Sequence, residues 1–259
     1  MNTAVTDASN PLISTPPRTE GELRRELAAC YRIFDHLGWV ELIYNHITVK
    51  VPGPERHFLI NPFGLMYREV TASNLVKIDL EGRIVGDASF PVNPAGFVAH
   101  SAIHEAIPEA LCIMHTHTTA GMAVACKPQG LTMTNFYAAM LHGKVAYHEF
   151  EGITVNPDEK PRLVASLARK RHLIMRNHGL LSWGETIPEA FMNLWTLNRA
   201  CEIQLASSAM PGGDIEIPAD ICAQSGREAL HTKAQYGAGR DVFDALRRII
   251  DAKDPSYRD

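Results

Sequence analysis

The segment Ala110-Leu111-Cys112-Ile113-Met114-His115-Thr116-His117 ends an apolar run in two histidines that are one residue apart. A short apolar run of this kind is typical of a buried strand, in which alternate side chains lie on the same face. His115 and His117 therefore point the same way and are able to hold one metal ion. Cys112 lies at an odd offset from His115, on the opposite face, and is not counted as a ligand. The segment predicts a strand that ends in two metal ligands.

A third candidate ligand lies in a strand–turn–strand pattern further along the chain. The turn Asn177-His178-Gly179 separates the apolar residues 173–175 from 180–183. Such a turn can bring His178 to the histidine pair. Three histidines with an open fourth position are typical of a catalytic metal site rather than a closed structural one. The alternative interpretation is that all three are ordinary core or surface members of the twelve histidines in the chain.

Composition restricts the function classes. The chain has 259 residues, 46% hydrophobic, and a formal net charge of -4, so nothing argues for binding of nucleic acid or of an anionic membrane surface. No apolar run reaches the length of a transmembrane helix, and the first residues lack the apolar core of a signal peptide. The five cysteines show no Cys-x-x-Cys spacing, which suits free thiols in a reducing compartment. We expect a cytoplasmic protein.

Helix and strand signals interleave along the chain and favour a layered α/β domain. Thr19 and Glu22 form a capping box, Asn93-Pro94 and Asn156-Pro157 are helix starts, and Thr186 with Glu189 is a second capping box. Strands are expected at 47–51, 57–60, 76–80, 83–85 and 145–147, and helices at 93–106, 118–125, 156–171 and 186–208. We divide the chain into a disordered segment 1–17, a metal-binding domain 18–210 and a helical extension 211–259 that packs on the same domain.

Five motifs together resemble the class II aldolase/adducin family. They are Tyr44-Asn45-His46-Ile47-Thr48, 59–65 (LINPFGL), His100-Ser101-Ala102-Ile103-His104, 114–118 (MHTHT) and 176–180 (RNHGL). The resemblance covers about residues 20–210. It implies a three-layer α/β/α sandwich with a mainly antiparallel central sheet, and a divalent metal on His115, His117 and His178. It also implies a ring-shaped homotetramer with active sites at the subunit interfaces.

The chain departs from the sugar-phosphate aldolases of this family at the positions that bind phosphate. A Ser-Ser-Glu run in those enzymes is Pro94-Ala95-Gly96 here, and a Thr before Gly64 is Phe63. Burying a phosphate against apolar groups without hydrogen-bond donors is costly. We therefore expect a non-phosphorylated hydroxy, keto or aromatic acid, contacted by Asn45, Phe63, Gly64, Gly96 and Arg176. Asn45 is the one retained residue of the anion-binding loop, and its alternative role is that of a turn residue.

The missing residue of the Ser-Ser-Glu run is the acid/base glutamate, so another group must transfer protons. We predict that His100 replaces it, because helical side chains lean toward the N-terminus and thus toward Gly96. Its alternative role is packing between helix and sheet. A phenol from a neighbouring subunit is a second candidate, with Tyr137 first and Tyr236 or Tyr257 after it. Arg176 is expected to pair with a substrate carboxylate or, alternatively, with the backbone of its own turn.

Three functions remain open. The first is a metal-dependent lyase, a decarboxylase or an aldolase, that cleaves a C–C bond through a metal-stabilised enolate. Zinc is expected first, with manganese, cobalt or iron as alternatives, because histidine ligands suit several of these ions. The second is a non-heme iron oxygenase on the same fold. The third is a non-catalytic, adducin-like assembly protein, against which the three retained metal histidines argue.

Overall fold

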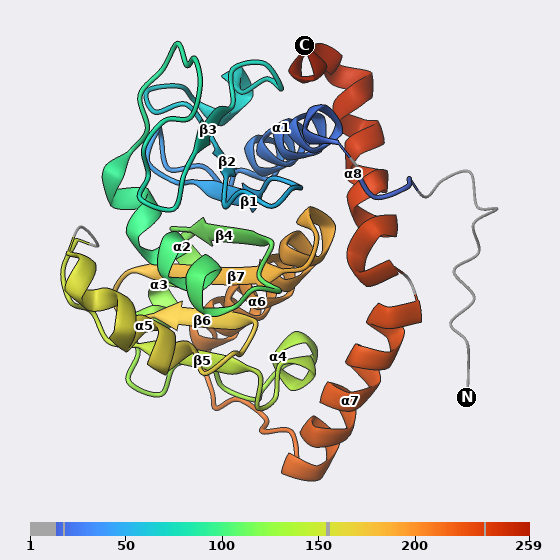
Figure 1. Ribbon diagram of the computed structural model, residues 1–259. Helices are drawn as coiled ribbons and strands as arrows, with labels where there is room; N and C mark the ends of the chain where they lie inside the picture. Colours follow the sequence, from blue (N-terminus) through green and yellow to red (C-terminus); the bar gives the residue numbers. More distant parts are fainter. Residues whose placement is uncertain (1–13, 18, 154–155, 236) are drawn as a thin grey trace, which may run out of the picture.

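A seven-stranded sheet forms the centre of the computed structural model (Figure 1), which describes residues 14–17, 19–153, 156–235 and 237–259. The strand order is β3-β2-β1-β4-β7-β6-β5. Only β5 and β6 pair in parallel, and the other five neighbouring pairs are antiparallel. The strands are β1 (Ile47–Lys50), β2 (Phe58–Ile60), β3 (Val76–Ile78), β4 (Cys112–Thr116), β5 (Val145–His148), β6 (His172–Met175) and β7 (Gly179–Gly184).

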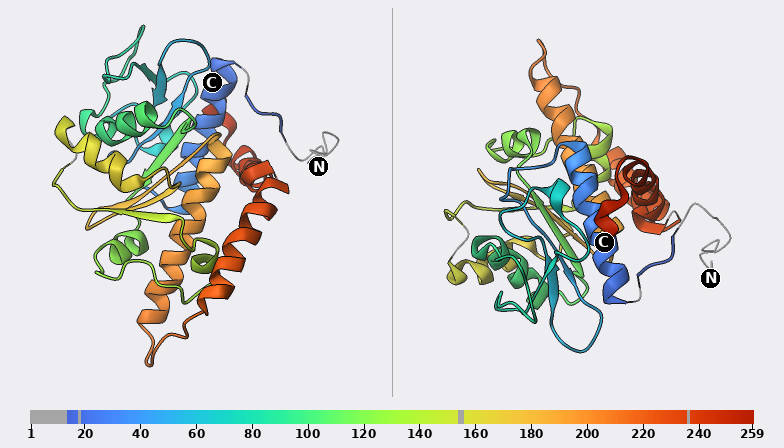
Figure 2. Two further views of the ribbon diagram at one scale, coloured as in Figure 1. Left: turned by 60° about the horizontal axis from the view of Figure 1, so that its bottom comes forward. Right: turned by 90° about the horizontal axis from the view of Figure 1, so that it is seen from above.

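Helices cover both faces of the sheet, which makes three layers (Figures 1 and 2). One layer contains α2 (Pro94–Ala106) and α5 (Lys160–Leu167); the opposite layer contains α1 (Glu20–Leu37), α3 (Thr119–Ala125) and α6 (Ile187–Ser208). The alternation along β4 follows these layers. Cys112 and Met114 belong to the core beneath α1 and α6, whereas Ile113 packs in the core beneath α2 and α5. The predicted α/β/α sandwich with a mainly antiparallel sheet is confirmed.

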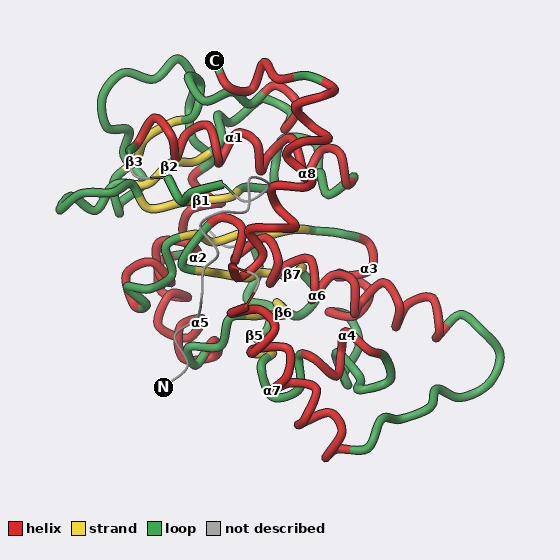
Figure 3. The backbone as a smooth tube through the Cα atoms, turned by 90° about the vertical axis from the view of Figure 1, so that its right-hand side faces the viewer, coloured by secondary structure: helices red, strands yellow, loops and turns green. Residues whose placement is uncertain are grey.

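The remaining elements lie at the ends of these layers. They are α4 (Phe136–Met140), α7 (Ala219–Gln235) and α8 (Arg240–Lys253), with short 3₁₀ helices at Tyr67–Glu69, Pro157–Glu159, Gly237–Gly239 and Pro255–Arg258. The chain between α6 and α7 forms a long loop at the lower right of Figure 3. α7 contacts α4, and α8 contacts both α1 and α6. No helix in the described ranges combines the length and apolar character needed to cross a bilayer.

Local signals account for most element boundaries. The side chain of Thr19 accepts from the backbone N–H of Glu22, and the Glu22 carboxylate accepts from the N–H of Thr19, which completes the first predicted capping box. At α6 the Thr186 side chain accepts from the N–H of Glu189, but the Glu189 carboxylate accepts from the N–H of Glu185, so only half of the second predicted box is formed. Two predictions were wrong. The helix expected to reach residue 171 ends at Leu167, because Ala168 and Arg169 adopt left-handed backbone conformations before β6 begins. The strand expected at 83–85 is a single bridge between Ile84 and Ile78, and Gly86, with φ of 81°, takes a left-handed conformation immediately after it.

The predicted disordered segment 1–17 lies, apart from residues 14–17, outside the described residues. At its described end, the backbone N–H and hydroxyl of Ser14 donate to the carboxylate of Asp244 on α8. A buried ion pair between Glu26 on α1 and Arg240 on α8 also joins the two ends of the chain.

Candidate metal centre

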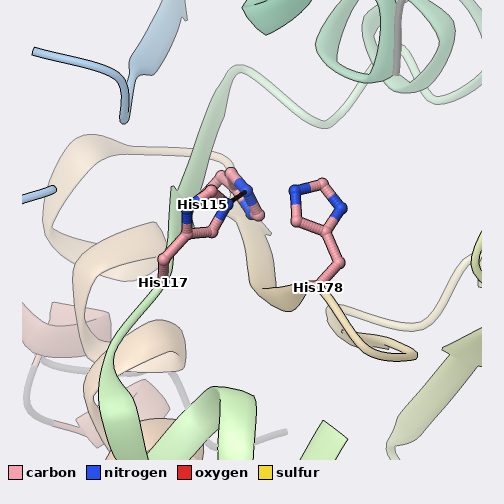
Figure 4. Close-up of side chains that lie close together, drawn as sticks. All are labelled: His115, His117 and His178. Carbon is pink, nitrogen blue, oxygen red and sulfur yellow. Dashed lines mark hydrogen bonds between the residues drawn. The ribbon is translucent and has the colours of Figure 1, made fainter. Parts of the chain in front are cut away.

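The three predicted ligands converge at one end of β4 (Figure 4). His115 is the penultimate residue of β4 and His117 follows the strand, on the sheet face that α2 covers. His178 lies in the hairpin between β6 and β7. The ring centroids of His115 and His117 are 4.6 Å apart. The ring centroid of His178 lies 4.8 Å from that of His115 and 4.9 Å from that of His117. One ligand atom from each histidine lies within 4.8 Å of the others, so the three are able to hold a metal ion.

The hairpin reaches β4 because two of its residues permit an unusually close approach. Asn177 takes a left-handed conformation, with φ of 54°, which asparagine tolerates better than most residues. Gly179 lies so close to β4 that a Cβ atom would be 2.4 Å from the carbonyl oxygen of Thr116. No side chain fits at that distance. The glycine after His178 therefore lets the third histidine reach the other two.

Hydrogen bonding orients His115, and burial keeps these histidines in the neutral form that binds a metal. His115 Nδ1 donates to the carbonyl oxygen of Leu180 at 2.9 Å, and a carbonyl contact of this kind leaves Nε2 free to bind a metal. Nε2 of His115 and Nε2 of His117 are 2.8 Å apart. Burial holds the pKa of His115 well below its usual range and lowers the pKa of His178 to about 4. Neutral imidazoles of this type fit zinc and other first-row divalent cations.

The triad opens into a cavity of about 330 Å³ between the sheet and α2. None of the described residues that line it is Asp, Glu, Lys or Arg. Two further histidines, His46 and His100, line it together with the triad. Its remaining described lining residues are Tyr44, Asn93, Gly96, Ala99, Phe150, Gly152, Ile153, Met175 and Leu181. The cavity thus combines imidazoles with apolar walls and holds no fixed charge from these side chains.

A chain of hydrogen bonds assigns the tautomer of His100. His104 Nδ1 donates to the carbonyl oxygen of Ala110 at 2.7 Å, and burial lowers the pKa of His104 to about 3, so its Nε2 is a bare acceptor. The Thr48 hydroxyl has one hydrogen, which it donates to that Nε2 at 2.8 Å. The hydroxyl oxygen must then accept from His100 Nδ1 at 2.7 Å. His100 Nε2 is consequently an unprotonated acceptor.

His46 is a site residue that the sequence analysis missed as a functional group. Its ring lies 4.3 Å from the ring of His100 and 5.8 Å from that of His115, centroid to centroid. It also fills the space that a side chain at position 96 would need, since a Cβ atom on Gly96 would be 2.7 Å from His46 Nδ1. The space beside the backbone of Gly96 is therefore occupied by the His46 ring. The sequence contained one indication of this fit, because a histidine in the 44–48 motif occurs together with a glycine at position 96.

Comparison with known proteins agrees with this geometry. The family model of the class II aldolase and adducin N-terminal domain matches residues 25–205. The chain belongs to this family. A Pseudomonas aeruginosa protein provisionally named an aldolase class 2 protein is 43% identical over 92% of this chain and 93% of its own. Rat alpha-adducin is 45% identical over 88% of this chain, which spans only 33% of that longer protein.

Solved structures of this family superpose closely on the chain. An aldolase II superfamily protein from Pseudomonas syringae has a TM-score of 0.89 and 40% identity, with 99% of this chain and 100% of that one covered. L-fuculose 1-phosphate aldolase from Glaciozyma antarctica has a TM-score of 0.82 and 31% identity, with 96% and 98% covered. The resemblance read from the five motifs is confirmed, and so is the fold that it implied.

Three predicted substrate-binding residues of this class II aldolase-family chain, Asn45, Phe63 and Gly64, are absent from the described lining of the cavity. Asn45 is buried, and its Oδ1 has no hydrogen-bond partner among the described residues. Phe63 packs against Tyr44, with 6.4 Å between ring centroids, and Tyr44 in turn lines the cavity. Gly64 is exposed, with φ of 102°. Among the predicted substrate-binding residues, the structure places Gly96 directly at the cavity.

Arg176 and Tyr137 point elsewhere in this chain. Arg176 Nη1 donates to the carbonyl oxygen of Lys127 at 2.7 Å, and its guanidinium lies 4.4 Å above the ring of Tyr147. Tyr137 on α4 packs edge-on against Trp195, with ring centroids 5.4 Å apart. Neither residue is in the described lining of the cavity.

The two alternative tyrosines of the tail differ in outcome. Tyr257 is buried in its own chain, and its hydroxyl donates to Asp251 at 2.5 Å, so it is not available to a neighbouring subunit. Tyr236 lies outside the described residues.

Proposed function

We propose that this protein is a divalent-metal-dependent lyase that cleaves a C–C bond in a non-phosphorylated hydroxy or keto acid, as a decarboxylase or an aldolase. The observation that carries the proposal is the convergence of three neutral imidazoles at a cavity that also contains His100 with an acceptor nitrogen. The relatives named as class II aldolases support the same reaction class.

His115, His117 and His178 would hold the cation, with zinc expected first and manganese, cobalt or iron as alternatives. A divalent cation in such a site withdraws electrons from substrate oxygens, which lowers the cost of negative charge left behind when a C–C bond breaks. The His100 Nε2 lone pair is placed to accept a proton from a substrate hydroxyl. In an aldol cleavage, that proton leaves as the hydroxyl carbon becomes a carbonyl. In a decarboxylation, the proton that carbon gains after carbon dioxide departs would come from a water molecule hydrogen-bonded to His100 Nε2, because that nitrogen carries no proton of its own.

The walls of the cavity support an organic acid with an apolar body. No lysine or arginine among the described lining residues is available to neutralise a phosphate dianion, and Phe63 stands at the position where the aldolase resemblance implies a threonine. Phe150 and Ile153 extend the apolar surface at the mouth. A carboxylate and hydroxyl that bind the cation, with an aromatic or aliphatic remainder against these side chains, fit this distribution.

The proposal includes a homotetramer with the active site at a subunit interface. Large apolar side chains are exposed at the mouth of the cavity, and Ile153 is 80% exposed there. A second subunit would cover this surface and bring its own side chains to the site. Tyr137 is our candidate for such a residue. Light scattering coupled to gel filtration tests the assembly, and a monomer at micromolar concentration would contradict it.

Elemental analysis of the purified protein, with His115→Ala beside it, tests the metal site. About one zinc, manganese or cobalt per chain, lost in the variant, supports the lyase and justifies a screen of hydroxy and keto acids for released carbon dioxide or aldehyde. His57→Ala is a matched control on the turn between β1 and β2 and should keep its metal. Stoichiometric iron together with substrate-dependent oxygen uptake would favour the oxygenase instead.

A second candidate function is an adducin-like assembly protein without catalysis. The 45% identity with rat alpha-adducin, as high as that with the provisionally named aldolase, is the observation that favours it. Metal-free protein in which His115, His117 and His178 tolerate substitution without loss of assembly would establish this alternative over the lyase.

A further inference from the structure

The imidazole of His46 occupies the side-chain position of residue 96. A Cβ atom built on Gly96 would lie 2.7 Å from Nδ1, 2.9 Å from Cε1 and 3.0 Å from Cγ of His46. Real Cβ atoms do not approach ring atoms this closely, and His46 is 93% buried and has little room to move. Any residue larger than glycine at 96 therefore requires the His46 ring to shift. The two positions are sterically coupled although they are far apart in the sequence.

Both ring nitrogens of His46 are buried and make no well-formed hydrogen bond with a described residue, although the polar backbone of Tyr44 lies close enough to raise the pKa of the ring. Leaving a buried polar group unsatisfied is unfavourable, and native proteins rarely do so without a reason. The ring lines the same cavity as the metal triad. Nε2 of His100, whose ring lies 4.3 Å away, is unpartnered in the same way. The unsatisfied nitrogens therefore gather at one place beside the triad, which is where a ligand would satisfy them.

We propose that His46 and Gly96 act together as one substrate-binding element. Gly96 leaves room for the His46 imidazole, and this imidazole forms a hydrogen bond with the substrate. This inference rests on the proposed metal-dependent function and names the substrate class more closely. A neutral imidazole in that place leaves the charge of a bound cation uncompensated by the described lining residues, none of which is acidic. The site should therefore prefer an anionic chelating group with a hydrogen-bonding atom beside it, such as a 2-hydroxy or 2-oxo carboxylate.

The steric coupling has a test that needs neither metal nor substrate. Gly96→Ala should lower the melting temperature of the metal-free protein by about 5 °C, because overpacking a buried site is destabilising. Gly21→Ala is the matched control near the start of α1, where a Cβ atom would meet nothing within 4 Å. In a His46→Ala background, Gly96→Ala should cost no more than Gly21→Ala. An equal loss in both backgrounds would overturn the coupling.

The ligand role is tested with cobalt-loaded protein and glycolate, the simplest 2-hydroxy carboxylate, followed by the visible spectrum of the bound cobalt. We expect His46→Ala to bind glycolate about tenfold more weakly, the change that loss of one hydrogen bond produces. His46→Gln should recover part of the affinity, and His57→Ala should match the wild type. Cobalt binding with unchanged glycolate affinity in His46→Ala would overturn the ligand role alone. Wild-type protein that binds no cobalt would overturn the proposed function and the ligand role together.

Discussion

The hydroxyl oxygen of Thr48 lies 2.7 Å from Nδ1 of His100, and this contact decides which nitrogen of His100 faces the cavity. Thr48 is on β1 and His100 is on α2, so the bond crosses from the sheet to the helix layer. His104, one turn along α2, provides the acceptor that orients the hydroxyl. The acceptor character of the His100 Nε2 atom is therefore set by groups that do not themselves line the cavity.

Thr48→Val keeps the shape of the side chain and removes the hydroxyl. We expect an unfolding free energy lower by about 1–3 kcal/mol, because both His100 Nδ1 and His104 Nε2 lose their partner. His100 should then populate both neutral tautomers, visible as a changed pattern of its ring nitrogens in ¹⁵N NMR. Thr196→Val on α6, whose hydroxyl donates only to the Met192 carbonyl, is the control. An unchanged His100 tautomer in Thr48→Val would contradict the assignment.

The stability of the metal-free protein should fall as the pH is lowered below 6.5. Burial lowers the pKa of His104 to about 3, and the nearby Lys50 and Arg56 act in the same direction. Between pH 6.5 and about 3 the unfolded state therefore binds a proton at this residue that the folded state does not. The unfolding free energy decreases with falling pH in that window, by up to about 1.4 kcal/mol per unit for one such proton.

His104→Gln tests this contribution because glutamine does not titrate. Urea denaturation at a series of pH values gives the unfolding free energy as a function of pH. Between pH 6 and 4, this free energy should change less steeply with pH in the variant than in the wild type, by the equivalent of up to one proton. Above pH 7, where histidine is neutral in both states, the two slopes should agree. Identical slopes at acid pH would show that His104 is protonated in the folded protein.

Gly179→Ala should impair metal binding at the candidate centre. The added methyl group would collide with the Thr116 carbonyl oxygen and with the ring of His117, so the hairpin that contains His178 must move away from β4. Loss of a group that only orients a metal ligand typically lowers metal affinity by at least about tenfold. Displacement of the ligand His178 itself should lower the affinity by at least that amount. Competition with a chelator measures the affinity. Gly213→Ala, where a Cβ atom meets nothing within 4 Å, should leave it unchanged.

Removal of one partner of the buried ion pair Glu26–Arg240 should lower the unfolding free energy more than replacement of both partners by apolar residues. Both side chains are 6% exposed, and they join α1 to α8. Burial raises the pKa of Glu26 against the opposing effect of Arg240. Glu26→Leu or Arg240→Leu alone leaves a buried charge unpaired and should cost about 3–5 kcal/mol of unfolding free energy. The double variant should recover most of that loss. Additive losses in the double-mutant cycle would contradict the coupling.

Much of the fold follows from short-range signals in the sequence. The capping residues Thr19 and Thr186 mark the starts of α1 and α6, and the apolar run before His115 marks β4. Strand periodicity also placed Cys112 opposite His115, because side chains alternate between faces. These signals depend on residues within a few positions of one another. The end of α5 was missed because two left-handed residues, Ala168 and Arg169, carry no distinctive local pattern.

The candidate site was predictable only where a motif carried its chemistry locally. The histidine pair at 115 and 117 needed no partner to be recognised, and His178 followed from its turn. The roles of Thr48 and His104 depend on contacts between β1 and α2, and the fit of His46 against Gly96 depends on a contact between α2 and the residue before β1; no local pattern reports either. Arg176, which the sequence offered as a carboxylate ligand, is held instead by the Lys127 carbonyl in another loop.

By itself, the sequence determined the layered α/β architecture, the family and the three histidines able to hold a metal, because periodicity, caps and ligand spacing act over a few residues. The tertiary structure alone decided that Gly179 brings His178 to β4, that the Thr48 hydroxyl orients His100, and that His46 fills the space beside Gly96. The physical reason is that steric exclusion and hydrogen-bond direction operate between atoms a few ångströms apart. Those atoms come from strands and helices that only folding brings together.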